Sequence, residues 1–200
     1  MEKGMILGLA GFPNSGRDTI ANILVEKHGF TRYAFADKLR EMALDLNPWI
    51  AIIQSDGLCF RRLADIIDEL GWDKAKRTIP EVRECLQNLG EKARNHFGQH
   101  IWIDPVYGKM WENTMMPRAV ITDFRYPNEE YKIRRNTPDD IPFHLLRVVR
   151  PGVEANTTHV SEAGYAQMHF SYPVNNDGTL EDLEGLVAGL VEMVEAEKDE

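Results

Sequence analysis

This sequence has little of what marks several large protein classes. Cys59 and Cys85 are the only two cysteines among 200 residues, and their spacing fits no metal site, which favours a reducing compartment over a disulfide-bonded scaffold. No apolar run approaches the roughly 20 residues that a membrane-spanning helix needs, and the first apolar segment lacks a cleavage motif. We therefore expect a cytoplasmic protein that makes no contact with a membrane.

Positive charge is also scarce. The 23 lysines and arginines are outnumbered by 32 acidic residues, which gives a net charge of −9. Most of this excess lies in residues 181–200, a pattern typical of a solvated helix face. A broad nucleic-acid-binding surface is therefore not expected, although scattered arginines can still form a small anion pocket. The length suits one α/β domain with a real core.

The most informative stretch is residues 5–19, where an apolar run leads into a glycine-bounded loop and then into a helical pattern. This order is typical of a phosphate-binding loop, because successive backbone N–H groups and the start of the helix converge on phosphate oxygens. A glycine-rich turn that binds nothing is the alternative. The candidate phosphate-binding residues are Gly11, Asn14, Ser15, Gly16, Arg17, Asp18 and Thr19.

One position departs from the common G-x-x-x-x-G-K-[ST] pattern. Arg17 stands where lysine is usual, and Asp18 stands at the Ser/Thr position. Arginine keeps the positive charge but presents it on a wide planar fork instead of a compact ammonium group. We therefore expect phosphate binding to be retained and turnover to be altered.

Four further strands are expected, at residues 31–36, 118–123, 141–151 and 172–176. Their alternation with helical segments predicts a five-stranded parallel sheet flanked by helices. Between about 49 and 116 the strand pattern disappears, so we expect a helical insertion after the second strand and a core of residues 1–48 and 117–200. Residues 152–171 have few large apolar side chains, and we expect them to form a short lid.

Several charged residues fall at the carboxyl ends of the expected strands, the edge where open α/β sheets bind ligands. Lys38 and Arg40 lie in the first helical turn after the second strand, and surface charges are an equal alternative for them. Asp123 ends the third strand, with Arg125 two residues later. An acid in this place suits a Mg²⁺ ligand, although many strands end in aspartate.

A helix is expected to start near Pro80, with residues 78–81 as a capping box. Along it Arg83, Gln87, Gly90 and Arg94 recur at steps of four, three and four residues and share one face. Two arginines, an amide and a gap for close approach suit a phosphorylated base. A solvated helix face is the alternative.

Several motifs together resemble those of the phage-type deoxynucleoside monophosphate kinases. These are the loop at 11–19, the R-x-x-x-Q-x-x-G segment at 83–90, the D-x-R-x-x-x-E stretch at 123–129, the V-V-R-P-G segment at 148–152 and the N-D-G-T segment at 176–179. The aspartate after the basic residue of the loop belongs to that family's own pattern. The block at 148–179 is the most specific.

The resemblance implies a P-loop kinase fold, an acceptor-binding role for the insertion, and transfer of the ATP γ-phosphate to a deoxynucleoside 5′-monophosphate with Mg²⁺. It implies small-molecule partners without direct nucleic-acid binding, and the host cytoplasm if a phage encodes the chain. With the residues above, it gives Arg17, Arg150 and Asp123 as catalytic, Asn176 as an adenine contact, Asp18 and Asp123 as metal ligands, and Lys38, Arg40, Arg83, Gln87, Arg94 and Arg125 as acceptor ligands.

Two other functions stay open. A P-loop kinase for another phosphorylated acceptor, of the phosphomevalonate or dephospho-coenzyme A type, would keep the loop without needing Gln87. A nucleotide-binding sensor that has lost catalysis would explain Arg17 in the lysine position. Nothing in the sequence fixes the oligomeric state, and a homodimer is left open.

Overall fold

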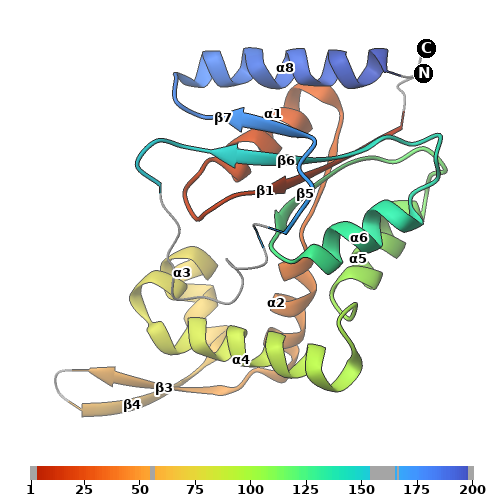
Figure 1. The fold of residues 1–200 in the computed structure, drawn as a ribbon. Helices are drawn as coiled ribbons and strands as arrows, with labels where there is room; N and C mark the ends of the chain where they lie inside the picture. Colours follow the sequence, from red (N-terminus) through yellow and green to blue (C-terminus); the bar gives the residue numbers. More distant parts are fainter. Residues whose placement is uncertain (1–3, 55–56, 154–164, 166, 198–200) are drawn as a thin grey trace. The chain divides into compact units, whose positions relative to one another are not determined.

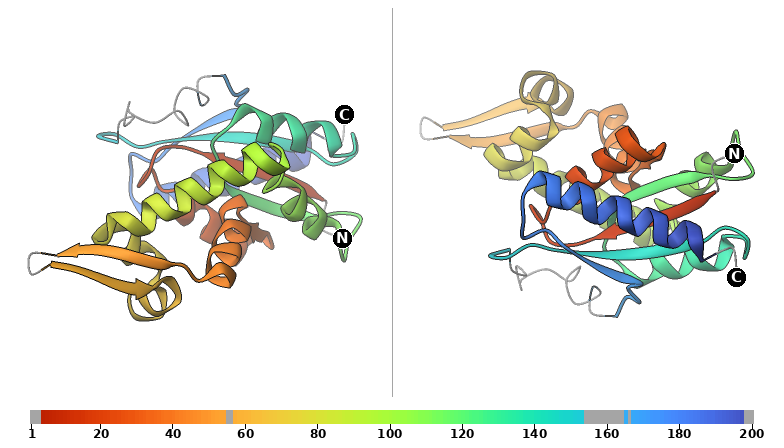
Figure 2. Two further views of the ribbon diagram at one scale, coloured as in Figure 1. Left: turned by 90° about the horizontal axis from the view of Figure 1, so that it is seen from below. Right: turned by 90° about the horizontal axis from the view of Figure 1, so that it is seen from above.

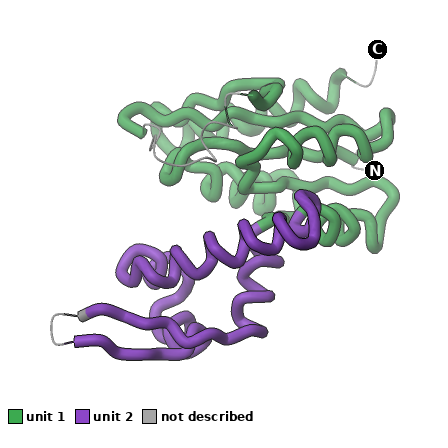
Figure 3. Tube along the Cα trace, turned by 60° about the horizontal axis from the view of Figure 1, so that its bottom comes forward, with its two compact units in different colours: residues 1–35, 103–200 green, residues 36–102 purple. Residues whose placement is uncertain are grey.

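The computed structural model describes residues 4–54, 57–153, 165 and 167–197. It divides into two compact units, shown in Figure 3: unit 1 comprises residues 1–35 and 103–200, and unit 2 comprises residues 36–102. The described part of the chain contains no helix of the length and apolarity required to cross a membrane.

Unit 1 is built on a five-stranded sheet in the order β2-β5-β1-β6-β7, with every neighbouring pair parallel. The strands are β1 (Met5–Ala10), β2 (Thr31–Tyr33), β5 (Arg118–Phe124), β6 (Phe143–Val149) and β7 (Tyr172–Asn175). All six residues of β1 are buried, because this central strand is covered on both faces. The expected α/β fold with five parallel strands is confirmed.

Helices cover both faces of this sheet (Figures 1 and 2). On one face lie α1 (Arg17–His28) and α8 (Leu180–Ala196), which share an apolar core with β1, β6 and β7. On the other face lie α5 (Ile103–Trp111) and α6 (Pro127–Asn136). Thr179 and Asp182 cap α8 reciprocally, which fixes the start of this helix at Leu180.

Unit 2 contains most of α2 (Phe35–Leu46), together with α3 (Leu63–Thr78) and α4 (Pro80–Phe97). It also contains an antiparallel hairpin of β3 (Trp49–Gln54) and β4 (Gly57–Arg62). The expectation that no strand occurs between 49 and 116 was therefore wrong. Ile50 and Ile52 are buried while Ile53 is exposed, so both faces of the hairpin are apolar and the alternation typical of a strand is hidden.

Two element boundaries in and around unit 2 also differ from the expected ones. Helix α2 begins at Phe35, so strand β2 ends at Tyr33 and is shorter than the expected strand at 31–36. Ile79 precedes α4, and the Thr78 hydroxyl donates to the Lys74 carbonyl, so the expected capping box is absent. Helix α3 continues past Gly71 through a kink at φ 68°. The Thr78 hydroxyl therefore has its partner within α3, and α4 begins without a side-chain cap.

Candidate active site

The loop between β1 and α1 has the backbone of an anion-binding turn. Asn14 and Gly16 adopt positive φ angles of 67° and 105°, and the Ser15 N–H donates to the Phe12 carbonyl at 3.1 Å. Gly16 is the N-cap of α1, and no side chain from the described residues caps that helix. The first N–H groups of α1 therefore lack a side-chain acceptor, an arrangement that suits a phosphate.

Ser15 is the second sign of a ligand at this loop. Its side chain is 1% exposed, and its hydroxyl has no hydrogen-bond partner in the part of the chain that the structure describes. Ser15 also lines a cavity of about 300 Å³. A buried hydroxyl without a partner is unfavourable, so a ligand oxygen in the cavity would satisfy it. The other residues that line the cavity are Phe12, Arg147, Val148, Val149, Arg150, Val153 and Tyr165.

Asn176 braces the loop from the end of β7. Its side-chain N–H donates to the Ser15 carbonyl at 2.9 Å, and its backbone N–H donates to the Val149 carbonyl at 2.7 Å. A methyl group at Gly16 would overlap the Asn176 amide nitrogen. Gly16 thus permits both the left-handed backbone and the close approach of this amide. The adenine contact expected of Asn176 stays a prediction.

Arg17 points from the start of α1 toward β5. Its Nη1 donates to the Thr122 carbonyl at 3.3 Å. Burial lowers the pKa of the guanidinium and the charge of Arg125 lowers it further, while Asp123, Asp18 and Tyr165 oppose the shift. Arg17 and Arg125 are therefore close enough to repel each other, which an anion between them would relieve.

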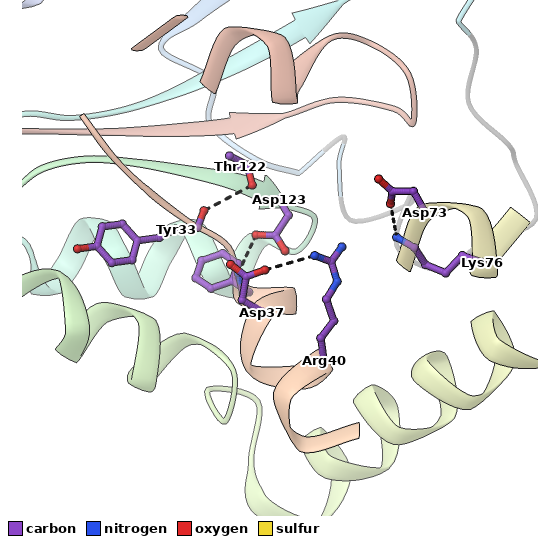
Figure 4. A network of polar contacts seen from close by, with 8 residues as sticks. Tyr33, Asp37, Arg40, Asp73, Lys76, Thr122 and Asp123 are labelled. Carbon is purple, nitrogen blue, oxygen red and sulfur yellow. Dashed lines mark hydrogen bonds and ion pairs between the residues drawn. The ribbon is translucent and has the colours of Figure 1, made fainter. Parts of the chain in front are cut away.

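Asp123 already has a structural partner. Its Oδ1 accepts a hydrogen bond from the Phe35 backbone N–H at 2.8 Å, at the start of α2 (Figure 4). Among the described residues, no group of three or more histidine, cysteine or acidic side chains could hold a metal. Mg²⁺ is commonly held by one or two carboxylates together with substrate phosphates. Asp18, exposed in the first turn of α1, and Asp123 stay the predicted ligands.

Glu129 holds the turn that carries Arg125. This carboxylate is 3% exposed, and its Oε2 accepts from the backbone N–H groups of Arg125 at 2.7 Å and Tyr126 at 3.0 Å. Sequence reasoning assigned it no role. A glutamate two residues after Pro127, at the third position of a helix, was the signal that could have identified it.

A second group that sequence reasoning missed lies at the mouth of the loop. The Tyr165 ring lies 5.2 Å from that of Phe12 and 5.0 Å from that of Phe170, and the Arg147 guanidinium faces both Tyr165 and Phe170. Arg150, the expected catalytic arginine, lines the cavity. Most of the expected lid at 152–171, including residues 154–164 and 166, lies outside the described residues.

In unit 2, the stripe of Arg83, Gln87, Gly90 and Arg94 along α4 is interrupted in its middle. Arg83 and Gln87 are exposed and Arg94 is half-buried. Gly90 leaves no gap for a ligand, because a Cβ there would lie 3.3 Å from the Leu39 side chain. The Gly90 carbonyl also accepts from the Trp102 indole at 3.2 Å. The expected gap at Gly90 was therefore wrong, and the glycine serves packing within unit 2.

The two cations at the start of α2 are paired with acids of the same helix. Lys38 binds Glu41 at 2.6 Å, and Arg40 binds Asp37 at 3.4 Å (Figure 4). The Arg40 guanidinium also lies 5.8 Å from the Trp72 ring. Such pairs between exposed side chains are weak and exchangeable. The acceptor role of Lys38 and Arg40 stays a prediction.

Comparison with known proteins finds one matching family. A sequence model described as deoxynucleotide monophosphate kinase matches residues 51–187. A protein of Acanthamoeba polyphaga mimivirus, provisionally named a deoxynucleotide monophosphate kinase, is 24% identical over 94% of this chain and 96% of its own length.

Solved structures with similarity to this chain include two kinases of small molecules. Dephospho-CoA kinase from Campylobacter jejuni is 14% identical with a TM-score of 0.46, over 94% of this chain and 96% of that one. Shikimate kinase from Bacteroides thetaiotaomicron is 12% identical with a TM-score of 0.43, over 96% and 98%.

Proposed function

Because this chain belongs to the deoxynucleotide monophosphate kinase family, we propose that it transfers the γ-phosphate of ATP to deoxynucleoside 5′-monophosphates for DNA precursor supply. The observation that carries the ATP-binding part is the loop at 11–19. There, the uncapped start of α1, the buried Ser15 hydroxyl and Arg17 offer donors to one anion.

The donor nucleotide is assigned to unit 1. The N–H groups from Asn14 onward bind phosphate oxygens, and Arg17 and Arg150 offset the charge of the moving phosphoryl group. Asp18 and Asp123 would hold Mg²⁺, which would offset the negative charge of the phosphates during transfer. The acceptor phosphate is itself the nucleophile, so the reaction needs no strong general base. This requirement agrees with a site composed mainly of arginines.

The acceptor nucleotide is assigned to Arg83, Gln87 and Arg94 on α4, with Lys38 and Arg40 of α2 as further cations for its phosphate. The acceptor role of Arg125, in unit 1, stays a prediction. Arginine forks suit the phosphate, and the Gln87 amide suits a base edge. Exposure of Arg83 and Gln87 supports this assignment, because both side chains can reach a ligand without rearrangement of the core.

A coupled ADP-release assay with MgATP and each of the four deoxynucleoside monophosphates tests the function. We expect turnover with at least one of them and none with dephospho-coenzyme A or phosphomevalonate. Turnover with either of the latter would instead assign the chain to another phosphorylated acceptor. ATP binding without turnover of any acceptor would support a sensor.

Replacing Arg83 with alanine is expected to raise the KM for the acceptor roughly ten- to a hundredfold while the KM for ATP changes little. Loss of one charge-assisted hydrogen bond costs about 1.5–3 kcal/mol. Lys92→Ala is the matched control, because Lys92 is exposed and lies nine residues along α4, on the opposite side of the helix. Equal acceptor kinetics in Arg83→Ala and Lys92→Ala would make the stripe an ordinary solvated face.

The cytoplasm is the compartment we infer for this activity. Cys59 and Cys85 are both free thiols, which suits a reducing environment. The expected partners are the two small-molecule substrates, without direct binding to nucleic acid.

A further inference from the structure

Arg147 is held beside the phosphate loop by aromatic rings. It is paired in the sheet with Ala10, the residue before Gly11. Its guanidinium carbon lies 5.7 Å from the centre of the Tyr165 ring and 5.9 Å from that of Phe170. The Tyr165 ring packs in turn on Phe12 of the loop. These contacts restrict a long flexible side chain without neutralising its charge.

Arg147 and Arg17 both act on the phenol of Tyr165. Burial raises the pKa of the Tyr165 phenol, while the charge of Arg147, its hydrogen bond to the phenol and the charge of Arg17 lower it. One hydroxyl therefore lies within the field of both arginines, and Arg17 also faces Arg125. Among the described residues, Arg147 has no acidic partner within ion-pair distance. Like charges brought together in this way favour an added anion.

The cavity gives that anion a place. Ser15, Arg147, Arg150 and Tyr165 all line the space of about 300 Å³, next to the N–H groups of the loop. We propose that Arg147 binds the terminal phosphate of the donor nucleotide together with Arg17, and that Tyr165 is a positioning residue that holds the Arg147 guanidinium in place. This assignment rests on the proposed function, because it presumes a nucleoside triphosphate at the loop.

The test compares two nucleotides that differ in the terminal phosphate. Calorimetric titration with Mg²⁺ and either AMP-PNP or ADP is carried out on the parent and on Arg147→Gln. We expect the variant to lose about tenfold or more in affinity for AMP-PNP, and less than about twofold for ADP. Arg135→Gln is the matched control, since Arg135 also lies over a tyrosine, Tyr131, at 5.8 Å, on exposed α6.

The positioning role of Tyr165 is tested by combining its variants with Arg147→Gln in a double-mutant cycle. Tyr165→Phe keeps the stacked ring and is expected to retain most of the AMP-PNP preference, whereas Tyr165→Leu is expected to lose it as Arg147→Gln does. In the double variant Arg147→Gln with Tyr165→Leu, the second change is expected to add almost nothing. Additive losses would overturn the role of Tyr165.

Equal losses for AMP-PNP and ADP, or no loss for either, would overturn the assignment of Arg147. Unfolding temperatures equal to that of the parent keep a folding defect apart from a binding defect. Failure of the proposed function is distinguishable, because it shows as absent deoxynucleotide turnover in the parent. The preference for AMP-PNP over ADP is measured by calorimetric binding and does not require turnover.

Discussion

Replacing Arg17 with alanine is expected to lower kcat/KM for nucleotide phosphorylation about 100- to 1,000-fold, the range found when one preorganised charge-stabilising donor is removed. Arg17 is oriented toward β5 by its hydrogen bond to the Thr122 carbonyl. Its charge adds to those of Arg125 and, by the assignment above, Arg147. Since these neighbours remain in the variant, we expect ATP binding to weaken less than turnover.

The lysine variant separates charge from shape. Arg17→Lys keeps the positive charge in a compact form that can follow the moving phosphoryl group. We expect it to retain turnover, and to exceed the parent rate if the planar fork is the limiting factor. Steady-state kinetics with MgATP and the preferred acceptor measure both variants, and Arg135→Ala is the control for loss of an arginine elsewhere in unit 1. Parent-like kinetics in Arg17→Ala would contradict a catalytic role.

Replacing Gly16 with alanine is expected to remove measurable ATP binding. The residue has a φ of 105°, which costs a side-chain-bearing residue about 1–2 kcal/mol. The added methyl group would also overlap the Asn176 amide, which donates to the Ser15 carbonyl. Relief of this overlap requires displacement of the loop, and with it of the N–H groups that bind phosphate. Calorimetric titration with MgATP gives the readout.

Two further variants separate backbone strain from overlap with Asn176 as causes of the lost ATP binding in Gly16→Ala. Gly71→Ala is the matched control for backbone strain, because Gly71 has a φ of 68° and open space around its missing side chain. It is expected to destabilise the fold modestly and leave ATP affinity unchanged. Gly16→Ala combined with Asn176→Ala removes the overlap but not the strain, so partial recovery of binding is expected. Absence of a difference between Gly16→Ala and Gly71→Ala in ATP binding would contradict the geometric argument.

The sequence by itself determined the frame of this protein. The strand, the loop and the start of the helix follow one another directly in residues 5–19. Their apolar and glycine patterns therefore identify this unit without knowledge of long-range contacts. The other four strands of the sheet were predicted from short runs of strand-forming residues between helical segments, of which β5 and β6 are largely buried and β2 and β7 largely are not. Arg17 was also identified from its place in the loop alone.

Predictions from local sequence patterns were wrong in unit 2 where contacts with other segments decide which side chains are buried. The hairpin at 49–62 exposes apolar side chains on one face, so its strands lack a polar alternation. The expected gap at Gly90 is filled by the side chain of Leu39, which lies far from it in the sequence. Helical spacing shows which residues share a face of a helix, but not which other side chains pack against that face.

Only the tertiary structure decided what positions the phosphate loop. Asn176 reaches the Ser15 carbonyl across 161 positions of sequence, and Arg147 meets Tyr165 beside Phe12. These contacts depend on the placement of β6 and β7 next to β1, which brings the ends of three strands to one edge. Strand order is set by the summed packing of the sheet and its helices, so no short stretch of sequence encodes it.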